Sequence, residues 1–478
     1  MLFSVPLTTY HRFQAIMPKH HSSSISTQLA RFVTQLELKN IPAPVQEKAL
    51  QLILDGTGIA YASSNYEFSK TALQALRAFA EPGSFHVLGT GEKMPYRDAA
   101  LANGLLIHGL DFDDTHVAGV VHMTSTVWPC VLAVAEKTNA SGEQMLEAYI
   151  AGMEVGARIG MVAKGAFHQV GHHPTGIAGA FACSLVAGKL MGLSEQQLVM
   201  AQGIALSMAS GNFEFLEDGA WTKRYHPGWA AVSGIMSATF AQAGYIGPNL
   251  PYEGRFGLYK SHLNELDSQC DYSLATSDLN KTWEVMNVGI KPYPSCHFTH
   301  AVIDATIQLT KQYSLTAEQV ESITTLVPEE VIKTVCEPLA TKQSPTCAYD
   351  AQFSAPYLIA IGLIRQEFSL QDLEPEPLKD PIVLALAKKV NYQADPDSGF
   401  PTYYSGEVRI KLKDGRILQQ REFKNRGCAD RPLSSNEINN KFLKNCTMTI
   451  SLEKANQIKD TILQMTTFKS VNELINIL

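Results

Sequence analysis

The sequence predicts a mainly α-helical protein, in which a large all-helical domain built from both chain ends carries a smaller inserted α/β lid domain. Residues 98–244 form successive Ala- and Gly-rich segments, a pattern typical of closely packed helices that are buried on all sides. After about residue 289, strand-like segments alternate with helical ones, which indicates a small α/β unit. From residue 433 onward the pattern is helical again.

These changes of pattern set the expected domain boundaries. The helical domain is predicted to comprise residues 26–287 and 433–478, and the α/β lid domain residues 288–432. Residues 1–25 are expected to be a flexible extension without the apolar core and cleavage site of a secretory signal. We therefore expect a cytoplasmic protein. The mitochondrial matrix is the alternative, if the extension is a presequence in a eukaryotic cell.

The first helices are predicted from the spacing of their apolar residues. This spacing indicates helices over 27–39, 45–63 and 71–80. Thr27 is expected to cap the first of them, and Pro42 and Pro44 are expected to end it.

The second half of the chain mixes both periodicities. A helix is expected over 297–313, a strand over 320–327, and a hairpin over 407–423 that turns at Asp414-Gly415. A helix capped by Ser434 or Ser435 with Glu437 should follow, and then helices over 452–463 and 471–478.

Composition excludes several classes of protein. The chain has 478 residues, a net charge of −7 and 18% charged residues, so a basic nucleic-acid-binding face is not expected. The long uncharged stretches at 165–188 and 227–252 are interrupted by Gly and Pro and are not predicted to cross a membrane. The eight cysteines occur singly, which favours free thiols over a disulfide framework or a zinc ribbon. The low charge is consistent with much buried surface, inside a large domain or in an oligomer interface.

An aspartate-rich segment is the first candidate for function. Ten of the 14 histidines lie between His108 and His300, and residues 108–122 place Asp111, Asp113 and Asp114 among apolar neighbours. Buried carboxylates are costly unless they are paired or functional. The alternatives are helix capping, or a magnesium site like that of terpene cyclases, which would need a second metal motif that the sequence lacks.

Two further segments suggest acid–base chemistry and anion binding. His173 comes just before a predicted helix, where a neutral imidazole suits a general base; a polar helix cap is the alternative. Lys223 and Arg224 form a cationic pair that suits a carboxylate-bearing substrate, although a solvated surface turn would look the same.

The remaining candidates lie in the second half of the chain. Cys296 and His297 are adjacent where the second domain begins, but neighbouring residues on a helix do not face each other, which argues against a thiol nucleophile. Tyr357 is either a site residue or a buried aromatic. Glycine-rich nucleotide loops, zinc-protease motifs and iron–sulfur spacings are absent, so a cofactor-free site of His, Lys, Asp and Tyr remains. Such groups can move a proton at a carbon α to a carboxylate.

Taken together, the segments resemble the MmgE/PrpD family, which contains 2-methylcitrate dehydratases, cis-aconitate decarboxylases and iminodisuccinate epimerases. The resemblance spans about residues 27–450. The matching stretches are LDGTG at 54–58, HGLDFDDTH at 108–116, HHPTGIAGAF at 172–181, DGAWTKRYHPGWAA at 218–231, EGRFGLY at 253–259, YPSCHFTHAVIDA at 293–305 and AQFSAPYLIA at 351–360.

The resemblance implies a two-domain fold, a homodimer, an active site between the domains, and no metal or other cofactor. The positions that match family catalytic residues are Asp111, Thr115, His122, His173, Lys223, His297 and Tyr357. Arg224 and His226 are expected to join Lys223 in binding substrate. One departure is that Met123-Thr124 follows His122 where the family often has Pro-Ser or Pro-Gly, which leaves the shape of this loop, and the substrate choice, open.

The expected function is that of a lyase acting on a small di- or tricarboxylate. Lys223 and Arg224 would neutralise carboxylates, and His122 or His173 would transfer the proton. Asp111 would orient a histidine and Thr115 would position a carboxylate. His297 and Tyr357 would donate to a departing hydroxyl or to an enolate.

The expected reaction is dehydration of 2-methylcitrate, catalysed by a hydro-lyase. Decarboxylation of cis-aconitate to itaconate comes next, and epimerisation of a substituted succinate third. A non-catalytic carboxylate-binding homologue is the alternative from another class.

Overall fold

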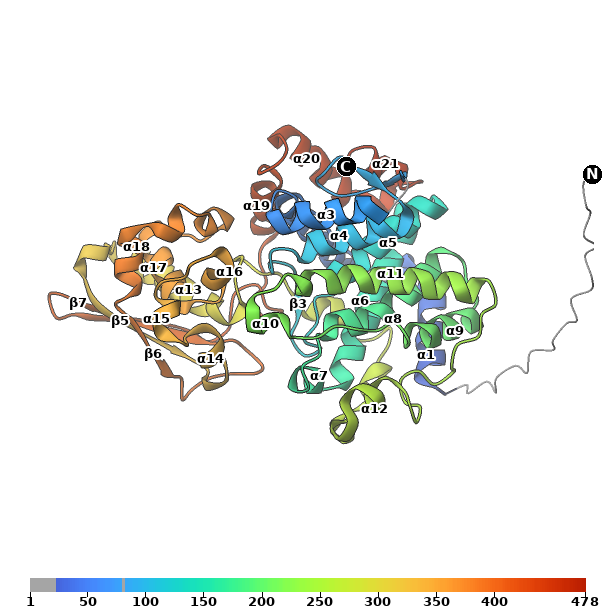
Figure 1. Ribbon diagram of the computed structural model, residues 1–478, viewed down its shortest axis with the longest axis horizontal. Helices are drawn as coiled ribbons and strands as arrows, with labels where there is room; N and C mark the ends of the chain where they lie inside the picture. The colour runs from blue at the N-terminus through green and yellow to red at the C-terminus, as the bar shows by residue number, and fades with distance from the viewer. Residues whose placement is uncertain (1–22, 80–81) are drawn as a thin grey trace, which may run out of the picture.

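The computed structural model describes residues 23–79 and 82–478, and it is mostly helical, as the sequence predicts. Two hydrophobic cores are present. The larger is formed by residues from 25–290 and 433–474. The smaller is formed mainly by residues from 293–412. Figure 1 shows the smaller, α/β part to one side of the helical part.

The helical part is built around a helix with no exposed face. In α8 (Pro174–Leu190), every residue from Pro174 to Gly188 is buried, as expected for a central helix. The other helices of this part that precede the α/β part are α1 (Ile25–Gln35), α2 (Ala43–Ser63), α3 (Glu67–Phe79), α4 (Tyr96–His108), α5 (Thr124–Thr138), α6 (Gly142–Val162), α7 (Ala166–Gln169), α9 (Glu195–Ala205), α10 (Phe215–Asp218), α11 (Thr222–Gln242) and α12 (Leu258–Leu263).

The predicted starts of the first helices need correction. Helix α1 is capped by Ser24, which accepts a hydrogen bond from the Thr27 backbone N–H, and the helix ends at Gln35 rather than residue 39. Helix α2 begins at Ala43 because Pro44 lies in its first turn, where a missing backbone N–H costs nothing. Most of the predicted extension over 1–25 lies outside the described residues.

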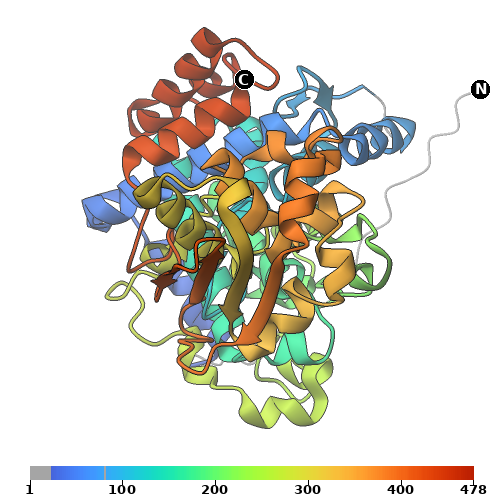
Figure 2. The same ribbon diagram turned by 90° about the vertical axis from the view of Figure 1, so that its left-hand side faces the viewer.

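The α/β part contains a four-stranded sheet in the order β6-β5-β7-β8. Its strands are β5 (Val320–Val327), β6 (Val390–Ala394), β7 (Gly406–Leu412) and β8 (Ile417–Glu422). Strand β5 pairs parallel to β6 and antiparallel to β7, and β7 with β8 forms the predicted hairpin. The sheet is visible face-on in Figure 2. The helices of this part are α13 (His300–Tyr313), α14 (Ile332–Val335), α15 (Leu339–Lys342), α16 (Ala348–Gln352), α17 (Ala355–Arg365) and α18 (Pro381–Ala387).

Helix α13 starts three residues later than predicted because 297–299 form a 3₁₀ turn. It packs on β7 and β8 and on α17. Strand β6 was not predicted. It is only five residues long, and the structure identifies it by its parallel pairing with β5.

The chain passes between the two parts twice. The first passage follows β4 (Val288–Gly289), which pairs with β3 (Thr115–His116), and the second leads into α19 (Ser435–Cys446). Ser434 and Glu437 form the predicted capping box of α19, which packs on α2. Helix α20 (Leu452–Leu463) has its predicted bounds, whereas α21 (Asn472–Ile475) is shorter than predicted. The remaining short strands are β1 (Phe85–His86) and β2 (Lys93–Met94).

Helices α4 and α11 cross closely enough to bring their functional ends together. A Cβ on Gly104 of α4 would lie 2.4 Å from the Gly228 Cα of α11, so only glycine fits here. This crossing places the first turn of α11, with Lys223, near the last residue of α4, His108. Within the described residues, no helix has both the length and the apolar character needed to span a bilayer.

Candidate active site

Side chains from both parts of the chain converge near the loop that follows α4. His108 ends α4, His122 lies just before α5, and His173 is the N-cap residue of α8. Lys223 comes from the first turn of α11, and His297 from the turn that opens α13. These residues and the aspartates of the loop influence one another's protonation, which places them in one electrostatic cluster.

Asp111 is held by two lysines. Lys223 Nζ donates to Asp111 Oδ1 at 2.8 Å, and Lys291 Nζ lies 3.2 Å from the same oxygen and 2.7 Å from the Asp111 backbone oxygen. Burial alone would raise the pKa of Asp111, but the two ammonium groups bring it well below its usual range. Asp111 adopts a left-handed backbone with φ +51°, which turns its carboxylate toward both lysines. The site therefore places two lysine ammonium groups on one carboxylate, with Lys291 buried and Lys223 partly exposed.

The aspartate that orients a histidine is Asp113 and not Asp111, which corrects the expectation from sequence. His108 Nδ1 lies 2.8 Å from Asp113 Oδ2, and both side chains are fully buried. Burial opposes ionisation of Asp113, yet His108 lowers the pKa of Asp113 to about 2. Asp114 accepts from the Thr124 backbone N–H at 3.2 Å, so capping explains this third carboxylate.

Three imidazole rings lie together beside the aspartate loop. The ring centroid of His108 is 5.1 Å from that of His122 and 5.6 Å from that of His173. Burial lowers the pKa of His122 to about 3 and that of His173 well below its usual range, so both rings are neutral near pH 7. His122 Nδ1 donates to the Asp114 carbonyl oxygen at 2.7 Å, with Thr115 Oγ1 3.3 Å away, which leaves His122 Nε2 as an acceptor.

His173 occupies the N-cap position of α8, but its side chain does not cap the helix, although the sequence allowed for that role. Its side chain makes no capping hydrogen bond, and its Nδ1 lies 3.0 Å from His226 Nδ1. His226 therefore contacts a candidate proton carrier directly. Its own pKa is lowered to about 4, mainly by burial.

Several polar atoms around this cluster are buried without a hydrogen-bond partner. Within the part of the chain that is described, they include His108 Nε2, His173 Nε2, His297 Nδ1 and the Tyr349 hydroxyl. Buried polar atoms normally have a hydrogen-bond partner. Four such atoms without a partner, close to two lysines, suit a polar ligand that would form hydrogen bonds with them. His297 accepts at Nε2 from the Asn425 side-chain amide at 2.9 Å, which leaves Nδ1–H as the donor.

Four residues of this arrangement were given no catalytic role from the sequence: His108, Asp113, Lys291 and Tyr349. The first two stand in the quoted 108–116 stretch, and Lys291 opens the segment that leads to His297. Their proximity depends on two separate chain segments meeting, which no local pattern reveals. Tyr349 is influenced by Asp111 and Arg224, and burial raises the pKa of Tyr349 above its usual range.

Two predicted residues are placed differently from the expectation. The Arg224 Nε donates to the Gly109 carbonyl oxygen at 2.6 Å, and its guanidinium lies 4.2 Å from the Phe68 ring centroid. Tyr357 does not join the cluster. It is fully buried in the smaller core, and its hydroxyl donates to the Asp372 carbonyl oxygen at 2.9 Å.

The alternatives of a metal site and a thiol nucleophile gain no support from the geometry. The three carboxylates of the aspartate loop face lysines, a histidine and a helix end instead of one shared point. Among residues 23–79 and 82–478, no group of three or more His, Cys, Asp or Glu residues is placed to hold a metal ion. Burial raises the pKa of Cys296 to about 11, so it is a thiol near pH 7.

Comparison with known proteins defines the class to which this fold and site belong. Models of the MmgE/PrpD N-terminal and C-terminal domains match residues 27–270 and 293–466, so the chain belongs to the MmgE/PrpD family.

Individual relatives are similar over almost the whole chain. A cis-aconitate decarboxylase-like protein, oryM, of Aspergillus oryzae is 26% identical, with 95% of this chain and 96% of that protein covered. The cis-aconitate decarboxylase of Aspergillus terreus is also 26% identical, over the same shares. The cis-aconitate decarboxylase of Homo sapiens is 27% identical, with 90% and 89% covered. The expected homodimer stays a prediction.

Protonation of the buried histidines should destabilise the protein in acid. The folded-state pKa of His297 is lowered to about 3, mainly by burial, whereas an unfolded histidine titrates near about 6.5. Its contribution to the free energy of unfolding is fully present above the unfolded value and is lost as pH falls toward the folded one. The free energy of unfolding should fall between neutral pH and about pH 5. We expect this fall to be smaller in His297→Gln than in the wild type, by about 2 kcal/mol.

Urea unfolding at both pH values measures this difference. Val302→Ala is the matched control, because it removes core volume from α13, the helix that follows the turn with His297, without changing a titratable group. Equal pH dependence in His297→Gln and wild type would contradict a neutral, buried His297.

Proposed function

We propose that this chain is a cofactor-independent lyase that acts on a small tricarboxylate and decarboxylates cis-aconitate to itaconate. The observation that carries the proposal is the pair of lysines on Asp111, set beside His108 and the neutral histidines. The family relatives described above support this carboxy-lyase reaction over dehydration of 2-methylcitrate, which was the first expectation.

Charge complementarity supports an anionic substrate. Lys223 and Lys291 together carry one positive charge more than Asp111 can neutralise, in a site where Lys291 is only 2% exposed. Buried charges interact strongly and are costly to leave unpaired. A substrate carboxylate would share the two ammonium groups with Asp111, and Arg224 would contribute further positive potential from the edge of the site.

The proposed reaction needs one proton donor and loses carbon dioxide. The bond from the methylene carbon of cis-aconitate to its carboxylate breaks, and its electron pair forms the new double bond to the central carbon. The former double-bond pair takes a proton at the carbon α to the remaining terminal carboxylate. His108 would deliver this proton from Nε2, which has no partner in the protein, while Asp113 holds the ring in place at Nδ1, and the ring would take up a new proton from water.

The neutral rings have a different role in this proposal. His122 Nε2 accepts hydrogen bonds, and His297 Nδ1–H and the Tyr349 hydroxyl can donate to carboxylate oxygens. A buried acid and buried bases in one site can also carry out dehydration or epimerisation, so the reaction must be assigned by experiment. Because His108, His173 and Lys291 are buried, movement of the α/β part relative to the helical part would ease substrate entry.

The products formed by the purified protein test the proposed reaction. NMR in deuterated water should show cis-aconitate converted to itaconate, with one deuterium on the methylene carbon next to the carboxylate, because the proton donor exchanges with solvent. His108→Asn should lower kcat by about a hundredfold or more, since it removes the general acid.

Activity should persist in EDTA if no divalent metal takes part. Loss of water from 2-methylcitrate with no itaconate from cis-aconitate would contradict the decarboxylase assignment and favour the hydro-lyase reaction. Turnover of none of these substrates would favour the non-catalytic carboxylate-binding alternative.

The two tyrosines should differ in their effects. Tyr349→Phe removes an unpartnered hydroxyl at the site and is expected to lower kcat/KM by about tenfold, the cost of one hydrogen bond to a charged group. Tyr357→Phe removes a hydrogen bond to the Asp372 backbone inside the smaller core, so it should cost about 1 kcal/mol of stability and leave kcat/KM close to wild type.

Steady-state kinetics and urea unfolding of both variants measure the contrast. If Tyr357→Phe lowered kcat/KM and Tyr349→Phe did not, then Tyr357 would belong to the site and Tyr349 would not.

A further inference from the structure

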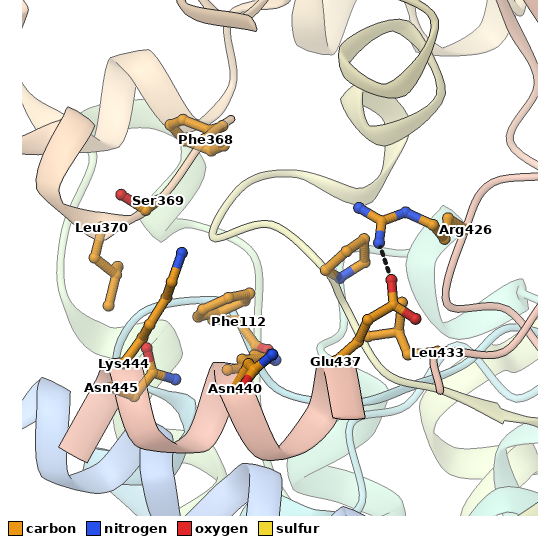
Figure 3. A pocket seen from close by; sticks show the side chains of 12 residues that line it. Phe112, Phe368, Ser369, Leu370, Arg426, Leu433, Glu437, Asn440, Lys444 and Asn445 are labelled. Carbon is orange, nitrogen blue, oxygen red and sulfur yellow. Dashed lines mark hydrogen bonds and ion pairs between the residues drawn. The ribbon is translucent and has the colours of Figure 1, made fainter. Parts of the chain in front are cut away.

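Apart from the active-site cluster, a pocket lies next to Phe112 of the aspartate loop, where the chain passes between its two parts. Its volume is about 210 Å³, and it is lined by residues of α19, by Phe368, Ser369 and Leu370 of the α/β part, and by Pro292 and Arg426 from the two passages. Figure 3 shows α19 along one side of this pocket and the Phe368–Leu370 segment opposite. None of these residues was assigned to the active site.

We call this cavity the hinge pocket, because it lies where the chain passes between the two parts. Its polar groups favour an anion. Three of its lining residues are basic, namely Arg426, Lys441 and Lys444, and only Glu437 is acidic. Arg426 is paired with Glu437 at 2.6 Å, and Lys441 is paired with Asp55. Lys444 remains available, because its ion pair with Glu367 spans 3.4 Å and both side chains are about two-thirds exposed. Its ammonium extends toward the Ser369–Leu370 segment in Figure 3.

A buried amide next to Lys444 gives independent support for a ligand. Asn445 is 4% exposed, and its Nδ2 has no hydrogen-bond partner in the structure. A buried N–H group without a partner is costly, and an acceptor oxygen of a bound ligand would satisfy it. Lys444 and Asn445 both line the pocket, so an ammonium and an amide donor are available there to a carboxylate group.

The rest of the pocket suits a short hydrocarbon chain. Its walls include Phe112, Phe368, Leu370 and Leu433. The volume is below the roughly 300 Å³ at which pockets for drug-sized ligands begin, so a ligand must be small. We propose that this hinge pocket binds a small aliphatic carboxylate, with its charged group at Lys444 and Asn445 and its chain against these apolar side chains.

The pocket is physically connected to the active site through Phe112. This residue stands between Asp111 and Asp113 in the chain, and its ring lines the pocket. Lys441 lies 3.7 Å from the centroid of that ring and donates to the Phe112 carbonyl oxygen at 3.0 Å. A ligand here would contact both α19 and the Phe368–Leu370 segment, and so would hold the two parts at their present separation.

This contact predicts inhibition that does not compete with substrate. If the buried site must open to exchange substrate and product, a ligand that bridges the hinge lowers kcat and changes KM little. The effect on turnover rests on the proposed function, whereas binding of the ligand does not.

Hexanoate is a suitable probe for the pocket, with binding measured by titration calorimetry on the full chain. We expect one site per chain in the wild type, and about tenfold weaker binding in Lys444→Met and in Asn445→Leu, because each loses one hydrogen bond to the carboxylate. Lys444 is exposed, so its substitution is not expected to disturb folding. Asn436→Leu on the same helix is the matched control, since Asn436 is exposed and does not line the pocket.

Three results would overturn the proposal. They are absence of hexanoate binding to the wild type, wild-type affinity in Lys444→Met and Asn445→Leu, and loss of binding in Lys223→Met, which would place hexanoate in the active site. Because the readout is binding, a failure of the proposed catalytic function would leave this test intact.

Discussion

The arrangement of the candidate site depends on one partly buried interaction, the contact of Lys223 and Lys291 with the carboxylate of Asp111. Each lysine comes from a different segment, one from the start of α11 and one from the passage into the α/β part, and Asp111 holds both ammonium groups in place. Two ammonium groups on one carboxylate leave positive charge that is not fully neutralised, and this is costly where one of the lysines is buried. The same imbalance favours binding of an anionic substrate.

The histidines fit this electrostatic setting. Positive charge and burial together keep His122, His173 and His297 neutral, because their pKa values all lie below the usual range for histidine. His108 differs because Asp113 lies against its ring. One fold thus places a histidine paired with a carboxylate next to histidines without such a partner, so residues of one type have different surroundings.

Much of this organisation could be predicted from the sequence, and the parts that could not share a physical cause. Local signals located α20, β5 and the β7–β8 hairpin, because capping residues and periodicity are contained within each segment. Asp111 was expected to orient a histidine, whereas its carboxylate contacts Lys223 and Lys291, which are far from it in the sequence, and a local pattern does not show such contacts. Tyr357 matched a family motif, yet its hydroxyl bonds inside the smaller core, and Tyr349, outside the quoted motif, lies at the site instead.

The most direct test of the central interaction is calorimetric binding of propane-1,2,3-tricarboxylate, the saturated analogue of aconitate, which cannot lose carbon dioxide by the proposed route. Lys223→Met and Lys291→Met should each weaken binding by about tenfold or more, because each removes a charged hydrogen bond. Asp111→Asn should bind at least as tightly as wild type, since both lysines are then free for the ligand. Unchanged affinity in the two lysine variants would contradict the assignment of this lysine pair as the carboxylate-binding centre.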